Sequence, residues 1–188
     1  MAPFYTRTGD DGTTSILGTG RLAKHHPRIE TIGTLDEASA ALGLARATIS
    51  SEQTKALLVE VQRDLYAMMA ELAATPENAS RFRTLDKPRL EWLESQTDQV
   101  TTRVPMPKDF ILPGDTPGGA ALSLARTIIR RAERHLAALA DHGEVESTVL
   151  LPYLNRLSSL CFALEMEENH RAGKETSIAK KTDPDAQG

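Results

Sequence analysis

Apolar residues recur three and four positions apart in five stretches of the chain, which is the spacing of amphipathic helices that pack in a bundle. The predicted helices span about residues 29–49, 52–74, 88–102, 117–142 and 147–170. In the fourth helix the apolar stripe consists of Leu122, Ala125, Ile129, Ala132, Leu136 and Leu139. No stretch shows the two-residue alternation of a convincing β-sheet. The pattern therefore predicts an all-α protein, a five-helix bundle.

Polar segments without a helical period flank the predicted bundle. Residues 1–27 form a head in which glycines stand among many Thr, Ser and Asp residues, which is typical of a loop. The bundle domain covers residues 28–171, and the polar residues 172–188 are predicted to form a disordered tail. Between the third and fourth helices, Pro105, Pro107 and Pro113 predict an extended connector.

Composition narrows the classes of function. The formal net charge of -4 argues against a duplex-binding protein, and an aromatic content of 4% argues against a base-stacking platform for single strands. No apolar run approaches the ~20 residues that span a bilayer. The first residues also lack the apolar core of a signal peptide, so we expect no membrane partner and a cytoplasmic location. The single cysteine, Cys161, lies among leucines, which predicts a buried, inert thiol rather than a reactive one.

The fourth predicted helix carries a cluster of cationic side chains. At about 100° per residue, Arg126, Arg130 and Glu133 share a second stripe that lies roughly a quarter-turn from the apolar one. These charges should therefore border the buried seam. Guanidinium groups in such a place suit an anionic ligand, because arginine offers planar, bidentate donors to phosphate. A helix face joined by ion pairs is an equally good interpretation of the spacing alone.

The head offers a second element that could hold an anion. Its backbone amides are freed by glycine, and its hydroxyl donors and one guanidinium could wrap phosphate oxygens. It is not a Walker A loop, because no Gly-Lys-Ser/Thr follows at the required spacing. Taken alone, such a segment is more often a surface loop. Two anion-binding elements in one small acidic protein favour the functional interpretation.

Other kinds of catalytic site have little support. Glu167 and His170 form one Glu-x-x-His pair, whereas a ferritin-like di-iron bundle requires two. One cysteine and scattered histidines disfavour a usual zinc site, and no Gly-x-Ser-x-Gly elbow is present. The nucleophile of any reaction therefore belongs to a substrate or cofactor. Phe110, in the connector, is either a core residue or the apolar wall of a pocket.

Five segments together resemble one family. They are Tyr5-Thr-Arg-Thr-Gly-Asp-Asp-Gly, Gly33-Thr-Leu-Asp-Glu, Phe110-Ile-Leu-Pro-Gly, Arg126-Thr-Ile-Ile-Arg-Arg-Ala-Glu-Arg and Tyr153-Leu-Asn-Arg-Leu-Ser. In this order they resemble the PduO-type ATP:cob(I)alamin adenosyltransferases, over roughly residues 5–170. The resemblance implies a ferritin-like five-helix bundle that forms a homotrimer with active sites between subunits. It also implies transfer of the 5′-deoxyadenosyl group of ATP to the cobalt of cob(I)alamin, with release of triphosphate.

The resemblance also implies roles for individual residues. The head of one subunit would hold ATP, and the fourth and fifth helices, in our interpretation those of the neighbour, would complete the ATP site. The head residues are Thr6, Arg7, Thr8, Gly9, Asp10, Asp11, Gly12, Thr13, Thr14, Ser15 and Lys24. The helix residues are Arg130, Arg131, Ala132, Glu133, Arg134 and Asn155. Asp36 and Arg126 would link subunits near the nucleotide, and Phe110 would pack under the corrin ring and keep the lower axial ligand off cobalt. Mg²⁺ would accompany ATP, and an adenosylcobalamin-dependent enzyme could accept the product.

Three positions depart from the pattern. Asp11 stands where many members have lysine, Ser39 stands in an Ala-Ser pair where many have Leu-Asn, and Ser123 replaces a frequent histidine. A phosphate-facing charge and an amide contact of the first helix are therefore in question. Two alternative functions remain: a sensor or delivery protein that binds ATP and cobalamin without turnover, and a structural oligomer in which the arginine stripe only joins subunits.

Overall fold

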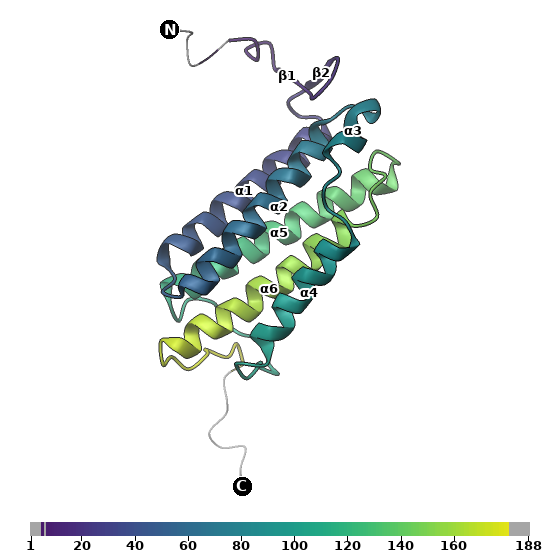
Figure 1. Cartoon of the computed structure of the whole chain (residues 1–188). Helices are drawn as coiled ribbons and strands as arrows, with labels where there is room; N and C mark the ends of the chain where they lie inside the picture. Colours follow the sequence, from purple (N-terminus) through teal and green to yellow (C-terminus); the bar gives the residue numbers. More distant parts are fainter. Residues whose placement is uncertain (1–4, 6, 181–188) are drawn as a thin grey trace.

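Helices account for most of the chain in the computed structural model, which describes residues 5 and 7–180 (Figure 1). Within these residues there are six helices: α1 (Pro27–Thr48), α2 (Glu52–Ala73), α3 (Pro76–Phe82), α4 (Lys87–Thr101), α5 (Pro117–Asp141) and α6 (Leu150–Arg171). The five helices expected from the apolar spacing correspond to α1, α2, α4, α5 and α6. The short α3 was not predicted. None of the helices in the described part is long and apolar enough to cross a bilayer.

The long helices pack side by side around one core, with α5 in the middle (Figure 1). Helix α5 packs against α1 on one side and α6 on the other, while α2 covers α1 and α4 covers α6. All six residues of the predicted α5 stripe are buried. The side chain of Cys161 is also fully buried, as expected, and burial raises the pKa of its thiol to about 12.

The start of α5 is fixed by contacts that need glycine. The Thr116 hydroxyl accepts a hydrogen bond from the Gly119 amide (2.9 Å) and donates one to Asn169 Oδ1 of α6 (2.8 Å). A Cβ atom on Gly119 would lie 2.6 Å from Asn169 Oδ1, and one on Gly118 would lie 2.8 Å from Ile49 Cγ2. The two glycines therefore let α5 begin close against both α1 and α6. The close packing at Gly118 and Gly119 fixes the position of α5, and with it the arginine cluster, along the axis of the bundle.

A buried polar network joins three helices. Tyr153 of α6 donates a hydrogen bond to Asp64 of α2, and Arg89 Nε of α4 donates to both oxygens of the same carboxylate (2.8 and 3.0 Å). The Arg89 guanidinium also lies over the ring of Trp92, 3.7 Å from its centroid. Burial and the neighbouring carboxylate raise the pKa of Tyr153, so its hydroxyl remains a donor. The network holds the covering helices α2 and α4 against α6.

The head departs from the prediction of a segment without sheet. Strands β1 (Thr13–Ser15) and β2 (Arg21–Ala23) form an antiparallel hairpin in which Thr14 pairs with Leu22. Each strand has three residues, which is too short for a two-residue alternation to stand out. The head is joined to the end of α2 by Leu17, whose amide donates to Ala73 O (2.7 Å) and whose carbonyl accepts from Thr75 N (3.1 Å).

The described part of the tail follows a defined path over the connector. Ile178 pairs with Ile111, the Leu112 amide donates to Ser177 O (2.8 Å) and the Ala179 amide donates to Phe110 O (2.7 Å). The prediction of a disordered segment from residue 172 therefore does not describe residues 177–179. Backbone pairing of this kind depends little on the pattern of side chains, so the spacing of apolar residues does not predict it. Residues 181–188 lie outside the described part.

Candidate functional site

The charged stripe of α5 borders the core, as its angular position predicts. Arg126 and Glu133 are half-buried, whereas Arg130, Arg131 and Arg134 are exposed. Several of these groups have partners: Asn155 Nδ2 of α6 donates to Glu133 Oε1 (2.9 Å), Arg134 Nη1 donates to the carbonyl of Arg130 (3.0 Å), and Arg131 forms an ion pair with Glu37 of α1. The ion-pair interpretation therefore holds for Arg131, and the anion-binding interpretation stays a prediction. Arg131 and Glu133 make ion-pair and amide contacts, and Arg126 and Arg130 line a cavity.

Two cavities meet at Arg126. The larger, of about 390 Å³, lies between α4, α5 and α6; its lining consists of Thr97, Thr101, Met106, Arg126, Arg130, Ser158, Ser159, Phe162 and Ala163. The second, of about 250 Å³, lies under the connector; its lining consists of Lys108, Asp109, Phe110, Ile111, Pro113, Ser123, Arg126 and Phe162. Arg126 and Phe162 belong to both. Both linings are mainly apolar. The larger cavity adds the Arg130 guanidinium and several hydroxyl groups, and the smaller adds charged side chains of the connector beside the exposed ring of Phe110.

Phe110 has the character of a pocket wall rather than of a core residue. Its side chain is 85% exposed in the single chain, on the rim of the smaller cavity. The alternative of a core residue is therefore wrong. A hydrophobic ring held open to solvent suggests that another molecule covers it.

Sequence reasoning missed Phe162, which lines both cavities, the smaller one together with Phe110. It follows Cys161 directly and lies off the buried stripe of α6. The available signal was an aromatic residue on the outer face of a helix in a protein with few aromatic residues.

The head holds its own polar groups together through Arg21. Arg21 Nε donates to Thr13 Oγ1 (2.7 Å), Nη1 donates to Ser15 Oγ (3.1 Å) and Nη2 donates to Thr13 O (3.2 Å) and to the carbonyl of Thr8. The carboxylate of Asp11 accepts from the amide and hydroxyl of Thr13 (2.9 and 2.7 Å), which holds the pKa of Asp11 below its usual range. Arg21 was not a candidate, yet it occupies hydroxyls assigned to ATP.

The remaining head candidates lie around this turn. The Lys24 amide donates to Gly12 O (2.9 Å), and the Lys24 amine lies beside Gly9. Gly12 has a φ of 81°, a conformation that favours glycine. Arg7 lies over the ring of Tyr5, 5.3 Å from its centroid. Asp10 donates its amide to Arg7 O (3.3 Å), and Thr14 is part of β1. Thr6 lies outside the described residues.

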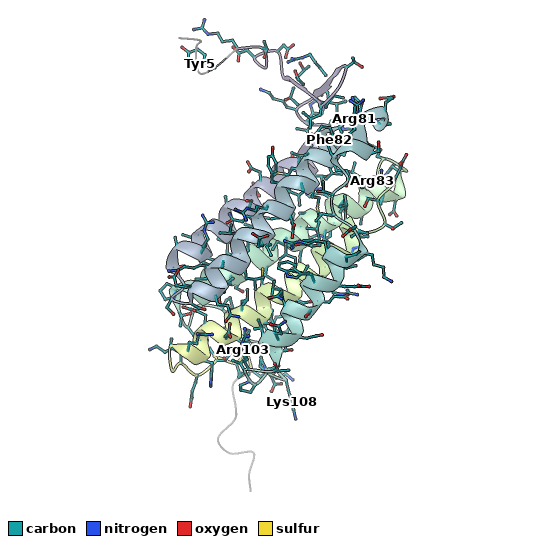
Figure 2. All side chains as sticks on the ribbon, viewed as in Figure 1. Tyr5, Arg81, Phe82, Arg83, Arg103 and Lys108 are labelled. Carbon is teal, nitrogen blue, oxygen red and sulfur yellow. The ribbon has the colours of Figure 1, made fainter. Side chains whose placement is uncertain are left out.

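One chain does not bring the candidate residues together. The head lies beyond the end of the bundle where α1 begins (Figure 1). Figure 2 shows Tyr5 of the head at one end of the molecule and Lys108, which lines the cavity under the connector, near the other. Asp36 of α1 is exposed and forms no ion pair with Arg126 within the described chain. The residues form two groups: the head, and the α5–α6 cluster with the connector.

Arg126 interacts electrostatically with a buried acidic residue of α6, Glu165. The side chain of Glu165 is 1% exposed, and neither carboxylate oxygen has a hydrogen-bond partner in good geometry. Burial raises the pKa of Glu165, while the nearby Ser123 hydroxyl and Arg126 guanidinium act in the opposite direction. Glu167, two residues on, is buried too but is paired with Arg103 (2.7 Å) and Arg171 (3.2 Å). Within the described residues, no three His, Cys, Asp or Glu side chains form a group that could hold a metal ion.

Known proteins share this sequence and fold. A family model described as cobalamin adenosyltransferase matches residues 4–168. The chain is 41% identical over 178 residues to the corrinoid adenosyltransferase PduO of Citrobacter freundii, covering 94% of this chain and 53% of that protein. It is 40% identical over 174 residues to the corrinoid adenosyltransferase of Bacillus subtilis, covering 90% of this chain and 88% of that one. The chain thus spans about half the length of the PduO relatives that it matches.

A solved structure is similar over almost the whole chain. It is a phenylalanine-to-histidine variant of a PduO-type ATP:corrinoid adenosyltransferase from Lactobacillus reuteri, complexed with cobalamin and ATP. The TM-score is 0.87 and the identity 34%, over 95% of this chain and 97% of that one. The family match covers the head, the connector and the arginine cluster alike. From sequence and fold together, the chain belongs to the cobalamin adenosyltransferase family.

Proposed function

We propose that this protein transfers the 5′-deoxyadenosyl group of ATP to the cobalt of cob(I)alamin and releases triphosphate. The observation that carries the proposal is the pair of cavities that meet at Arg126, one with guanidinium and hydroxyl donors and one with the exposed Phe110. A nucleotide needs cationic and hydroxyl groups for its phosphates, and a flat macrocycle needs an apolar wall. The adjacent cavities offer both kinds of group around Arg126. The family membership and the cobalamin- and ATP-bound relative support the same assignment.

The chemistry asks the protein for alignment and charge neutralisation rather than for a nucleophile. The electron pair comes from cob(I), the cobalt–carbon bond forms at C5′, and the bond from C5′ to the triphosphate oxygen breaks. Holding C5′ in line with cobalt removes most of the entropic cost of the encounter. Negative charge that grows on the leaving triphosphate is stabilised by fixed guanidinium groups. In our proposal Arg130 and Arg134 supply these, because both are exposed on one face of α5.

Asn155 and Glu133 have a supporting part in this arrangement. Their hydrogen bond fixes the amide of Asn155 beside the arginines and leaves its oxygen free to pair with the neighbouring Arg156, which donates to it (2.7 Å). Glu133 therefore organises the cluster and keeps the local positive charge from repelling itself. A magnesium ion bound to ATP would neutralise phosphate charge in the same site.

Phe110 and Phe162 are proposed to form the apolar side of the corrinoid site. A ring packed against the lower face of the corrin excludes water and the lower axial ligand, which makes the cobalt ion easier to reduce. The tail supports the position of Phe110, because the Ala179 amide is bonded to the Phe110 carbonyl (2.7 Å).

We further propose a homotrimer in which the head of one subunit meets the α5–α6 cluster of the next. The two groups lie apart in one chain (Figure 2), so one chain alone offers no complete site. Leu44 of α1 and Leu124 of α5 are 50% and 49% exposed. Each lies two turns from a member of the Glu37–Arg131 ion pair, so they are level on neighbouring antiparallel helices. This apolar face suits contact with a second copy, and Asp36 could then pair with Arg126 across it.

The reaction itself is the direct test. The protein is incubated with ATP, Mg²⁺ and chemically reduced cobalamin, and the cobalt spectrum is followed. Formation of adenosylcobalamin in proportion to the protein supports the proposal, and binding of both substrates without turnover would identify a sensor or delivery protein instead. Arg130→Ala should weaken ATP binding while the protein stays folded, since Arg130 is exposed. Unchanged ATP affinity would favour a purely structural role of the stripe.

We also propose that the reaction takes place in the cytoplasm and that an adenosylcobalamin-dependent enzyme accepts the product.

A further inference from the structure

We propose that Glu165 is a positioning residue for Arg126, holding its guanidinium in the wall that the two cavities share. The inference rests on the proposed adenosyl transfer, in which Arg126 borders both substrates. Glu165 does not line either cavity. It would act through Arg126 and not by touching a substrate.

The first argument is the lack of partners for three buried polar atoms. Both oxygens of Glu165 and the Nε atom of Arg126 are buried without a hydrogen bond in good geometry. Leaving such groups unpaired is costly, and a carboxylate costs more than a neutral group. Within the described residues Glu165 makes no direct ion pair, whereas the equally buried Glu167 makes two. A side chain kept only for packing would not need a charge here.

The second argument is the set of charged groups around the Glu165 carboxylate. From α5 it is faced by Arg126 and the Ser123 hydroxyl, from the segment before α5 by Asp115, and from its own helix by Cys161. Asp115 is engaged elsewhere, since it accepts hydrogen bonds from the Ser177 amide (3.1 Å) and hydroxyl (2.6 Å) of the tail. Arg126 is the one cation in this set. Within the described residues the two groups form no direct ion pair, so the attraction between them acts at longer range, and the burial of Glu165 strengthens it.

The third argument is the place of Arg126 itself. Its side chain is half-buried and lines both cavities, so one guanidinium borders the nucleotide side and the corrinoid side at once. A long side chain in that position needs to be held still, because a small displacement would disturb alignment of the two substrates. A fixed carboxylate behind it provides the anchor. A mobile Arg126 would instead turn toward the phosphates or into solvent.

The decisive variant is Glu165→Gln, which keeps the shape and removes the charge. We expect kcat/KM for cob(I)alamin to fall about tenfold, comparable to the loss of one charge-assisted interaction. The loss should shrink at acid pH, because protonation of Glu165 in the unaltered protein has the same effect as the substitution. Glu167→Gln is the matched control, since it removes a charge of equal burial from the same helix without facing Arg126. A Glu165→Gln protein with the same kcat/KM and pH profile as the control would overturn the proposal.

A double-mutant cycle keeps the inference separate from general loss of structure. In an Arg126→Gln background the Glu165→Gln change should have little further effect on kcat/KM, because the group through which Glu165 acts is gone. Additive losses in the cycle would show that Glu165 acts independently of Arg126. Thermal unfolding and titration with ATP and cob(II)alamin give readouts besides turnover.

If Glu165→Gln does not fold, Glu165→Asp, which retains the charge but shortens its reach, takes its place and should also lower kcat/KM. Failure of the proposed function would instead appear as no turnover by the unaltered protein.

Discussion

At the scale of single residues, Phe110 is the clearest case of a side chain that stability alone does not explain. A large aromatic ring that is 85% exposed contributes little to the core, and it lies on the rim of a cavity that also contains Arg126. Its neighbour Leu112 is 54% exposed in the same segment but does not line that cavity. The two residues therefore separate the effect of the pocket from the effect of an exposed apolar surface.

We predict that Phe110→Ala lowers the rate of adenosylcobalamin formation by about tenfold or more, since each factor of ten requires only ~1.4 kcal/mol of lost transition-state stabilisation. The free energy of unfolding should change by less than about 0.5 kcal/mol, as for other surface substitutions. Stopped assays for turnover and urea titrations for stability measure the two effects. Leu112→Ala is the control and should leave the rate unchanged. Equal losses in both variants would mean that the segment, and not the ring of Phe110, matters.

At the scale of elements, the head is the least supported part of the described chain. Its hairpin has strands of three residues, and a two-stranded hairpin alone is only marginally stable. Its cross-strand contacts depend on exposed bonds of Arg21, and its link to α2 runs through Leu17. Such a segment can reorganise at low cost, as our proposed ATP site requires if phosphate oxygens are to replace the guanidinium as partners of the hydroxyls.

We therefore predict that amides of residues 7–24 exchange with deuterium rapidly in the ATP-free protein, because few apolar contacts protect them. Exchange should slow when ATP is added, and the amides of α5 in the core should change little. Hydrogen exchange followed by mass spectrometry resolves these segments. Strong protection of the head before ATP is added would contradict the prediction and would indicate a preformed site.

How far the sequence predicts each element depends on where its residues lie. The five long helices follow from their apolar stripes, because each buries a continuous face. Helix α3 has no buried residue and hence no stripe to recognise. The pairing of residues 110–112 with 177–179 runs through backbone groups that any sequence carries. Helix α3 and this backbone pairing therefore become visible only in the tertiary structure.

The site divides in the same way. The border position of Arg126 follows from helical geometry, whereas the roles of Phe110 and the head came through resemblance to a family. The sequence also carries a signal for Glu165, since it lies four positions after Cys161 on the buried stripe of the last helix. A charge at a stripe position is a signal of its own. The stripe of the last helix does not predict which cation interacts with Glu165, because that cation, Arg126, lies on another helix.

At the scale of the whole molecule, two buried glutamates make stability depend on pH. Glu71 of α2 is buried and forms an ion pair with Arg83 (3.1 Å). Burial raises the pKa of both Glu71 and Glu165 above the ordinary value of 4.5. Arg83 acts against this at Glu71, and the Ser123 hydroxyl and Arg126 do so at Glu165. At pH values between the ordinary and the raised pKa, these two carboxyls bind more protons in the folded protein than in the unfolded chain. Stability contributed by these groups is therefore greatest below pH 4.5 and decreases as pH rises through the raised pKa.

We predict that the double variant Glu71→Gln and Glu165→Gln has a free energy of unfolding that falls less steeply above pH 4.5 than that of the unaltered protein. Each glutamate can account for at most about 1.4 kcal/mol per pH unit of this slope. Urea unfolding at a series of pH values measures it. Parallel curves for the two proteins would show that both carboxyls titrate normally in the fold.

The proposed trimer makes a prediction that a single-chain site does not make. If each active site joins the head of one subunit to α5 of the next, Lys24→Ala damages one side of a site and Arg130→Ala damages the other. Trimers made of only one variant should be nearly inactive. In trimers formed from an equal mixture, about a quarter of the interfaces combine an intact head with an intact α5, because each side is intact with a chance of about one half.

Co-refolding the two variants should therefore restore about a quarter of the adenosylation rate of the unaltered protein, and sedimentation should give the mass of a trimer. The control is the mixture of each variant with itself, which should stay inactive. A site within one subunit predicts no recovery at all, because every chain then carries a damaged site whatever its neighbours are. The recovered fraction thus measures directly whether the two groups of residues, which lie apart in one chain, meet across the boundary between subunits.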